Sequence, residues 1–110
     1  MQMLSVVIIT YNEEKNIGRC IDSVQSIADE VVILDSFSTD NTASIAASKG
    51  ATIYNNSFEG YIEQKNKALS LAKYDLVLSL DADEALDERL KASITSVKQH
   101  AGNKGYTITK

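Results

Sequence analysis

The sequence predicts an α/β fold, an open and mostly parallel sheet with helices on both faces. Three apolar runs lack the polar alternation of a half-exposed strand, which is typical of strands buried on both faces of a parallel sheet. Segments with apolar residues at helical spacing separate these runs. Strand and helix therefore alternate along the chain, the order that right-handed crossovers build into a Rossmann-like sheet.

The predicted strands span residues 4–10, 31–34 and 76–80, and a weaker run at 51–54 is expected nearer a sheet edge. A last strand is expected over residues 106–109, after a turn at 102–105. Because this strand stops at the end of the sequence, we interpret residues 1–110 as a single domain and expect it to continue past Lys110.

Four helices are expected between the strands. Glu13 and Glu14 would lie in the acidic first turn of the first helix, and Asp40 or Thr39 would cap the second, which Gly50 would end. The apolar positions at helical spacing are, in chain order, Ile17, Cys20, Ile21, Val24 and Ala28; Ala43, Ile45 and Ala46; Ile62, Ala68, Leu69 and Ala72; and Leu86, Leu90, Ile94, Val97 and Ala101.

Composition excludes several functional classes. The 110 residues are 44% hydrophobic and 24% charged, which is ordinary for a soluble globular domain, and no run approaches the length of a membrane span. The net charge of -4 argues against nucleic acid as a partner. The single cysteine, Cys20, lies on the apolar side of a predicted helix and favours a reducing, cytoplasmic compartment over a disulfide framework.

Acidic and hydroxyl side chains follow the predicted strands at one edge of the sheet. In open parallel sheets ligands bind outside the carboxyl ends of the strands, where the strand order reverses. The side chains expected at this edge are Thr10, Tyr11, Asn12 and Glu13; Asp35, Ser36, Ser38, Thr39 and Asp40; and Asp81, Asp83 and Glu84. The opposite edge reads as ordinary mixed surface, so the asymmetry indicates a ligand site.

Asp81 and Asp83 carry the most specific chemistry at this edge. Residues two apart on an extended strand project to the same face, and two close carboxylates repel each other unless a cation, a proton or a hydroxyl-rich ligand separates them. A divalent metal with a phosphate-bearing substrate satisfies this pair. The chain has no glycine-rich phosphate cradle, which favours a metal-assisted nucleoside diphosphate conjugate as the ligand. The alternative is a surface turn whose acids open the next helix.

Four segments carry a family resemblance. In order and spacing, SVVIITYNEE at 5–14, DSFSTDNT at 35–42, QKNKAL at 64–69 and DADE at 81–84 resemble the motifs of family 2 glycosyltransferases. The last two segments are most similar to the bacterial branch that includes β-glucosyltransferases of lipopolysaccharide core assembly. The resemblance implies the nucleotide-binding, donor-binding half of a GT-A domain.

The resemblance implies a role for each matching residue at the nucleoside end of the donor. Thr10 and Tyr11 would line the base pocket, with the Tyr11 ring available for stacking. Glu13 would accept from ribose hydroxyls. Asp35 would accept the N3 proton of the base, a contact that favours uracil over cytosine. Dipole stabilisation of a helix is the alternative for Glu13, whereas Asp35 ends a strand and has no equally good structural explanation.

The remaining matches concern the diphosphate. Lys65 would neutralise the diphosphate or contact the base, Asp81 would meet the ribose, and Asp83 would bind Mg²⁺ or Mn²⁺ between the phosphates. Lys65 could equally be a solvated helix residue, and Glu84 could belong to the metal shell or to the helix entry. Phe37 stands where a small residue is common in the family, as does Lys67, and both bear on fine donor specificity.

The implied reaction is inverting transfer of a sugar, most simply from a UDP-sugar, to a glycan or lipid-linked acceptor. Its catalytic base is expected downstream of Lys110, because Asp87 and Glu88 read as first-turn helix residues. The chain alone is therefore expected to bind the donor without completing transfer. A non-catalytic nucleotide-binding or interaction module is the alternative. An Asp-x-Asp phosphatase is disfavoured, because the motif follows a late strand and Ala85 replaces the expected Thr or Val.

Location and assembly follow from the resemblance and the sheet. The protein is expected in the cytoplasm, and a lipid-linked acceptor would bring it to the inner face of the membrane as a peripheral protein. A sheet that stops early leaves apolar surface that a homo-oligomer would cover.

Overall fold

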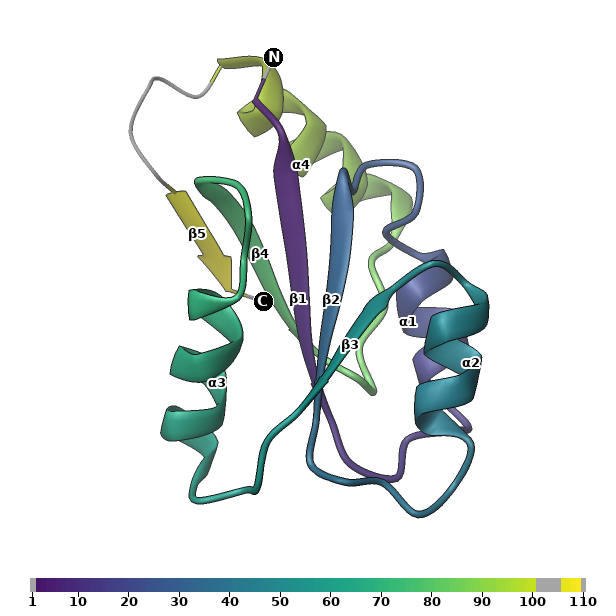
Figure 1. Ribbon diagram of the computed structural model, residues 1–110. Coiled ribbons are helices and arrows are strands. Elements are labelled where there is room, and N and C mark those ends of the chain that lie inside the picture. The colour runs from purple at the N-terminus through teal and green to yellow at the C-terminus, as the bar shows by residue number, and fades with distance from the viewer. Residues whose placement is uncertain (1, 101–105, 110) are drawn as a thin grey trace.

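Strands and helices alternate along the whole of the computed structural model, which describes residues 2–100 and 106–109 (Figure 1). The strands are β1 (Leu4–Thr10), β2 (Glu30–Asp35), β3 (Thr52–Asn55), β4 (Leu76–Asp81) and β5 (Tyr106–Thr109). The helices are α1 (Ile17–Asp22), α2 (Thr42–Ser48), α3 (Tyr61–Ser70) and α4 (Glu88–His100). The predicted Ala101 helix position and the turn at 102–105 lie outside the described residues.

The five strands form one sheet in the order β3-β2-β1-β4-β5, and every adjacent pair is parallel. This confirms the predicted α/β class and places the weak strand β3 at an edge. The first strand is central: Thr10 pairs with Asp35 of β2, and Ile9 pairs with Asp81 of β4. The strand order reverses between β1 and β4, which is where an open sheet binds its ligand.

Helices cover both faces of the sheet, as predicted. Figure 1 shows α3 on one side and α1 and α2 on the other. Alternate residues of β1 divide between the two faces because successive side chains of a strand point in opposite directions. Val6 and Ile8 pack in the larger cluster with residues of α1, α2 and α4, whereas Val7 packs with Ala68 of α3. Burial of each such side chain stabilises the fold by roughly 1.5–3 kcal/mol.

Helix α1 is shorter than its apolar period predicts. It ends at Asp22, and turns carry the chain through Val24, which is nevertheless fully buried. The Ser23 hydroxyl donates to the Cys20 carbonyl at 2.7 Å and accepts from the Leu86 amide at 3.0 Å. Such a side chain competes with the helical backbone pattern, which gives a physical reason for the early end.

The acidic first turn predicted for α1 is also wrong, because that helix has no acidic residue in its first turn. The N-cap of helix α2 is Asn41, so the prediction of Asp40 or Thr39 at that position is wrong by one or two residues. The Asp40 carboxylate accepts from the Thr42 amide at 2.9 Å, and Gly50 follows the helix with φ +87°. Glycine adopts that conformation without the steric cost of a Cβ.

The edge opposite the candidate site holds a buried lysine. Lys98 of α4 is 8% exposed, and its Nζ donates to the Ile27 carbonyl at 2.7 Å and to Asp29 Oδ2 at 2.9 Å. The same oxygen accepts from the Leu4 amide at 2.7 Å. Burial raises the pKa of Asp29, but these hydrogen bonds and the lysine charge outweigh it and leave that pKa below its usual value. Lys98 and Asp29 therefore join α4 to the segment before β2 and to β1 at this edge. The prediction of ordinary surface there was incomplete.

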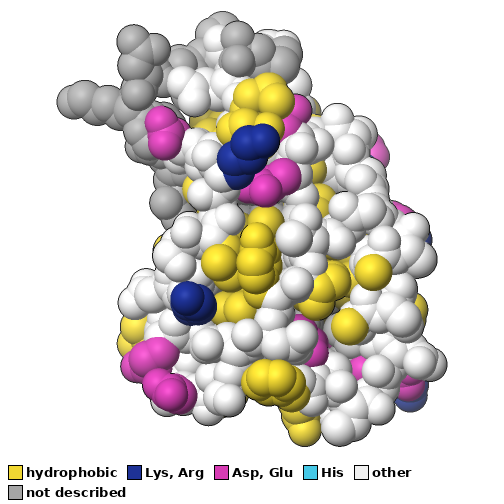
Figure 2. Space-filling view, viewed as in Figure 1, with side chains coloured by type: hydrophobic (Ala, Val, Ile, Leu, Met, Phe, Trp, Pro, Cys, Tyr) yellow, Lys and Arg dark blue, Asp and Glu magenta, His cyan; other side chains and the backbone are white. Residues whose placement is uncertain are grey.

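Hydrophobic side chains also reach the surface. Figure 2 shows them in the middle of the face that it presents, with few Lys or Arg side chains nearby. The large exposed hydrophobic residues are Met3, Tyr11, Phe37, Tyr54, Phe58, Tyr61 and Ile62. Within the described residues, no helix is long and apolar enough to cross a membrane.

Candidate functional site

A pocket of about 300 Å³ opens at the carboxyl ends of β1 and β4, at the point where the strand order reverses. It is bordered by Ile9, Thr10, Tyr11, Glu13, Ser36, Phe58, Tyr61, Gln64, Asp81, Ala82 and Asp83. Five of the seven predicted site residues thus line one cavity: Thr10, Tyr11, Glu13, Asp81 and Asp83. Asp35 and Lys65 are not among the residues that border it.

The loop after β1 presents the polar residues of one side. Asn12 has φ 50°, a left-handed conformation that Asn tolerates better than most residues. Its amide donates to Ser38 Oγ at 2.8 Å, and its Oδ1 accepts from the Thr39 amide at 2.8 Å, so this loop is fastened to the loop after β2. The Glu13 amide donates to Thr42 Oγ1 at 2.8 Å. These bonds fix the backbone of the loop and leave Tyr11, which is 59% exposed, at the border of the pocket.

Asp35 has a structural role that the sequence did not reveal. It is 1% exposed, and its Oδ1 accepts from Thr10 Oγ1 at 2.5 Å and from Ser38 Oγ at 2.6 Å. Its Oδ2 accepts from the Ser38 amide at 2.7 Å. A carboxylate has about four lone-pair positions, so one remains for a further donor such as a base N–H.

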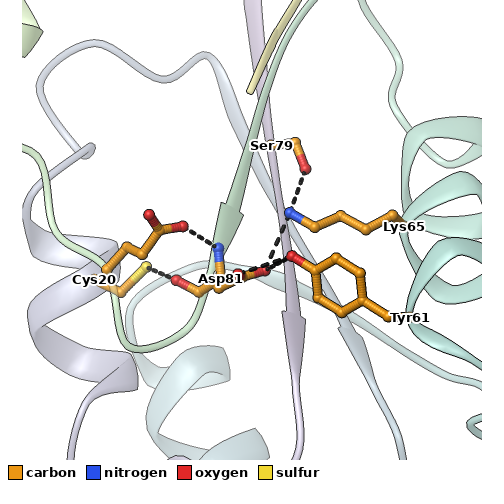
Figure 3. A network of polar contacts seen from close by, with 6 residues as sticks. Cys20, Tyr61, Lys65, Ser79 and Asp81 are labelled. Carbon is orange, nitrogen blue, oxygen red and sulfur yellow. Dashed lines mark hydrogen bonds and ion pairs between the residues drawn. The ribbon is translucent and has the colours of Figure 1, made fainter. Parts of the chain in front are cut away.

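Asp81 is the centre of a polar network (Figure 3). Lys65 Nζ lies 3.1 Å from Asp81 Oδ1 and donates to Ser79 Oγ at 3.1 Å. The Tyr61 hydroxyl donates to the same carboxylate, at 3.0 Å from Oδ1 and 2.9 Å from Oδ2. The Lys65 side chain is only 13% exposed, which excludes the alternative that it is a solvated helix residue.

The acids after Asp81 separate into two roles. Glu84 Oε1 accepts from the Asp81 amide at 2.9 Å, while the Glu84 amide donates to the Asp81 carbonyl at 3.0 Å, so Glu84 closes the turn. Asp83 is exposed and lines the pocket. The turn therefore directs Asp83 toward the place where a ligand would lie.

A metal ion in this pocket would need the substrate to supply most of its ligands. Among the residues that the structure describes, no three His, Cys, Asp or Glu side chains converge as a metal-binding group. The exposed carboxylate of Asp83 still fits Mg²⁺ or Mn²⁺, because a small hard cation often takes one or two protein carboxylates and fills its other positions with substrate phosphates and water.

Cys20 lies beneath the acidic edge and is a core residue, as predicted. It is fully buried, and its Sγ lies 3.7 Å from the Asp81 carbonyl. Burial, with the nearby charges of Glu84, Asp83, Asp81 and Glu13, raises the pKa of the Cys20 thiol to about 12. A thiol of that kind is neither a nucleophile nor a metal ligand near neutral pH.

Sequence reasoning assigned no role to several pocket residues. Gln64 is 1% exposed, donates to Ser36 Oγ at 3.0 Å and accepts from Asn56 Nδ2 at 3.1 Å, so it joins α3 to the loop after β2. Tyr61 lies one helical turn before Lys65, a spacing that puts both on one side of α3. That spacing was the signal in the sequence that could have placed Tyr61 beside Lys65 at the site. Phe58 lies in a loop, and nothing in the sequence pattern marked it.

A pocket with acidic side chains at the switch point of an open parallel sheet lies where α/β domains of this class bind their ligands. Residues 5–103 match the family described as Glycosyl transferase family 2. An uncharacterized glycosyltransferase of Rickettsia typhi is 45% identical over 94 residues, 86% of this chain and 32% of the relative. The lipopolysaccharide core biosynthesis glycosyltransferase LpsC of Rhizobium meliloti is 41% identical over 93 residues, 80% of this chain and 34% of that protein. The chain spans about a third of the length of these relatives.

Solved structures agree. Glucosyl-3-phosphoglycerate synthase from Mycobacterium tuberculosis, in complex with UDP, superimposes with a TM-score of 0.74 at 27% identity, over 93% of this chain and 41% of that chain. The same enzyme with Mn²⁺, UDP-glucose and phosphoglyceric acid gives a TM-score of 0.66 at 28% identity, over 76% and 35%. The chain belongs to glycosyltransferase family 2 and has the GT-A type of fold.

Proposed function

We propose that residues 1–110 form a single nucleotide-sugar-binding domain that holds the donor, most simply a UDP-sugar, for metal-assisted transfer of a hexose. The observation that carries the proposal is the single pocket that joins Thr10, Tyr11 and Glu13 with Asp81 and Asp83. Structural relatives bound to UDP and Mn²⁺ support the same ligand class.

The proposed division of the pocket follows its chemistry. The exposed ring of Tyr11 stacks on the base, and the remaining lone pair of Asp35 accepts the base N3 proton. Glu13 and Asp81 accept from ribose hydroxyls, since a carboxylate is an acceptor for paired hydroxyls. Lys65 supplies positive charge behind Asp81.

Asp83 is proposed to hold Mg²⁺ or Mn²⁺ together with the donor diphosphate. When bound, the cation stabilises negative charge on the departing diphosphate. The residues of this chain bind and orient the donor, and the loops after β1 and β2 keep those residues fixed through the Asn12 and Asp35 hydrogen bonds.

The proposed reaction is inverting transfer to a glycan or lipid-linked acceptor. Each pocket carboxylate has a donor-side assignment here, so the base that activates the acceptor is expected elsewhere in the protein. We therefore expect no sugar transfer by residues 1–110 alone. The similarity to LpsC supports an acceptor of the lipopolysaccharide or cell-envelope polysaccharide class. A cytoplasmic location, contact with the inner membrane face and self-association stay predictions.

The test is titration calorimetry of UDP with Mn²⁺, repeated with EDTA and with Asp83→Ala. Both changes are expected to weaken UDP binding by about tenfold or more, because the diphosphate loses its counter-charge. Glu88→Ala, a matched carboxylate on the exposed start of α4, should leave binding unchanged. UDP binding that resists EDTA and Asp83→Ala would contradict the metal assignment, and absence of UDP binding would contradict the function.

A further inference from the structure

We propose that Tyr61 is a placeholder for the donor: its hydroxyl occupies the position on Asp81 that a pair of neighbouring ribose hydroxyls would take, so the donor must displace it to bind. This inference rests on the proposed function, in which Asp81 meets the ribose. It assigns Tyr61 a role in setting donor affinity.

The geometry of the contact carries the proposal. The Tyr61 hydroxyl oxygen lies 3.0 Å from Asp81 Oδ1 and 2.9 Å from Oδ2, so it stands almost symmetrically in front of the carboxylate (Figure 3). A ligand with two adjacent hydroxyls approaches a carboxylate along the same line, with one hydroxyl for each oxygen. The tyrosine hydroxyl and the ribose pair therefore compete for one position.

Lys65 is held more firmly than Tyr61, by two polar partners and by burial. Its Nζ is bonded to both Asp81 and Ser79, and its side chain is 13% exposed. Lys65 does not border the pocket, so it can remain paired with Asp81 Oδ1 when a ligand arrives. The Tyr61 ring lies over the same ammonium group, 5.5 Å from the ring centroid, which adds a weak attraction that keeps the ring inward.

Tyr61 is free to leave. It is the first residue of α3, lines the pocket and is 53% exposed, so its ring can turn to solvent without breaking a helix or strand. Its hydroxyl then bonds to water, and the charge of Asp81 stays compensated by Lys65. The cost of donor binding is the loss of one hydrogen bond to a partly exposed carboxylate.

Partial desolvation of the Tyr61 hydroxyl and its bond to Asp81 raise the pKa of the phenol and outweigh the opposing charge of Lys65, in keeping with a hydroxyl that acts as a donor to an anion. The Phe58 ring borders the same pocket but has no hydroxyl, so it does not duplicate the contact.

The experiment is a double-mutant cycle on UDP affinity, measured by calorimetry with Mn²⁺ on the wild type, Tyr61→Phe, Asp81→Ala and the double variant. Tyr61→Phe keeps the ring and removes only the competing hydroxyl. It is expected to tighten UDP binding about fivefold, the effect of losing one hydrogen bond to a partly exposed carboxylate from the unbound protein. In the Asp81→Ala background, Tyr61→Phe should leave the UDP affinity unchanged.

Inorganic pyrophosphate with Mn²⁺ is the matched ligand control, because it has no ribose and should bind the wild type and Tyr61→Phe equally. Equal or weaker UDP binding by Tyr61→Phe, at unchanged thermal stability, would overturn the placeholder and leave Tyr61 as a pocket wall. A gain in UDP affinity from Tyr61→Phe that persists in the Asp81→Ala background would also overturn the placeholder role. A wild type that binds pyrophosphate but no UDP would overturn the proposed function and this inference together.

Discussion

Removal of the Asp35 carboxylate tests how the pocket is supported. Asp35→Ala deletes the acceptor of three hydrogen bonds, from Thr10 Oγ1, Ser38 Oγ and the Ser38 amide. Thr10 is 5% exposed, so its hydroxyl loses its partner out of reach of bulk water, whereas the Ser38 groups lie in a half-exposed loop. Asp35→Asn keeps the shape of the side chain.

The expected magnitudes follow from these partners. One orphaned buried donor costs about 1–3 kcal/mol, and the two loop contacts add about 1 kcal/mol, so Asp35→Ala should destabilise the protein by about 3 kcal/mol. In Asp35→Asn, the amide oxygen can accept from the Ser38 amide while the NH₂ group donates to the two hydroxyls, which can reverse. We expect that variant to cost about 1 kcal/mol, for the loss of the charge.

Urea denaturation followed by circular dichroism measures both variants, and the difference between them is the informative quantity. Thermal midpoints should fall by about 12 °C for Asp35→Ala and about 4 °C for Asp35→Asn. Equal losses in the two variants, or a loss below about 1 kcal/mol for Asp35→Ala, would refute the view that hydrogen-bond satisfaction fixes this loop. The Asn variant also reports on the proposed base contact: UDP should bind several-fold more weakly, with pyrophosphate unaffected.

Four further outcomes are expected. Because the pKa of Cys20 rises from 9.0 to about 12, its thiol should react with Ellman's reagent at pH 8 about a thousandfold more slowly in the folded than in the urea-unfolded protein; comparable rates would contradict its burial. The same shift makes stability fall as the pH rises above the unfolded thiol pKa toward the folded one, which a Cys20→Ala variant should lessen in alkaline denaturation curves. Lys98→Met leaves the Ile27 carbonyl unpaired and should cost about 1–3 kcal/mol in urea, while UDP affinity stays at the wild-type value, since the change lies at the opposite edge. Gly60→Ala should cost about 1–3 kcal/mol in urea denaturation because φ is +151° there, and an unchanged free energy of unfolding would count against strain at that position.

The strands could be predicted because strands that are buried on both faces have uninterrupted apolar sequences. The early end of α1 was not, because it depends on the Ser23 hydroxyl meeting the Leu86 amide from a distant segment. Helical periodicity records which residues are buried, and Val24 is buried whether a helix or a turn carries it.

For the candidate site, too, one part could be predicted from the sequence and another could not. The chemistry at the strand ends could be predicted, since polar residues follow each strand and topology brings those ends together. The partners of each group could not. Asp35 bonds to Thr10 because the register of β1 on β2 sets them opposite each other, and no pattern in one sequence fixes that register. The pairing of Lys65 with Asp81 likewise needs the position of α3 over β4.

The central place of β1 has a consequence for the nascent chain. Among the described strands β1 leaves the ribosome first, yet its two sheet neighbours are residues 30–35 and 76–81. Until β4 has been synthesised, one edge of an uncharged, apolar strand has no partner. During the synthesis of residues 11–75 the aggregation-prone segment therefore lacks one of its sheet neighbours, and chains arrested before residue 76 are expected to depend on chaperones or to precipitate.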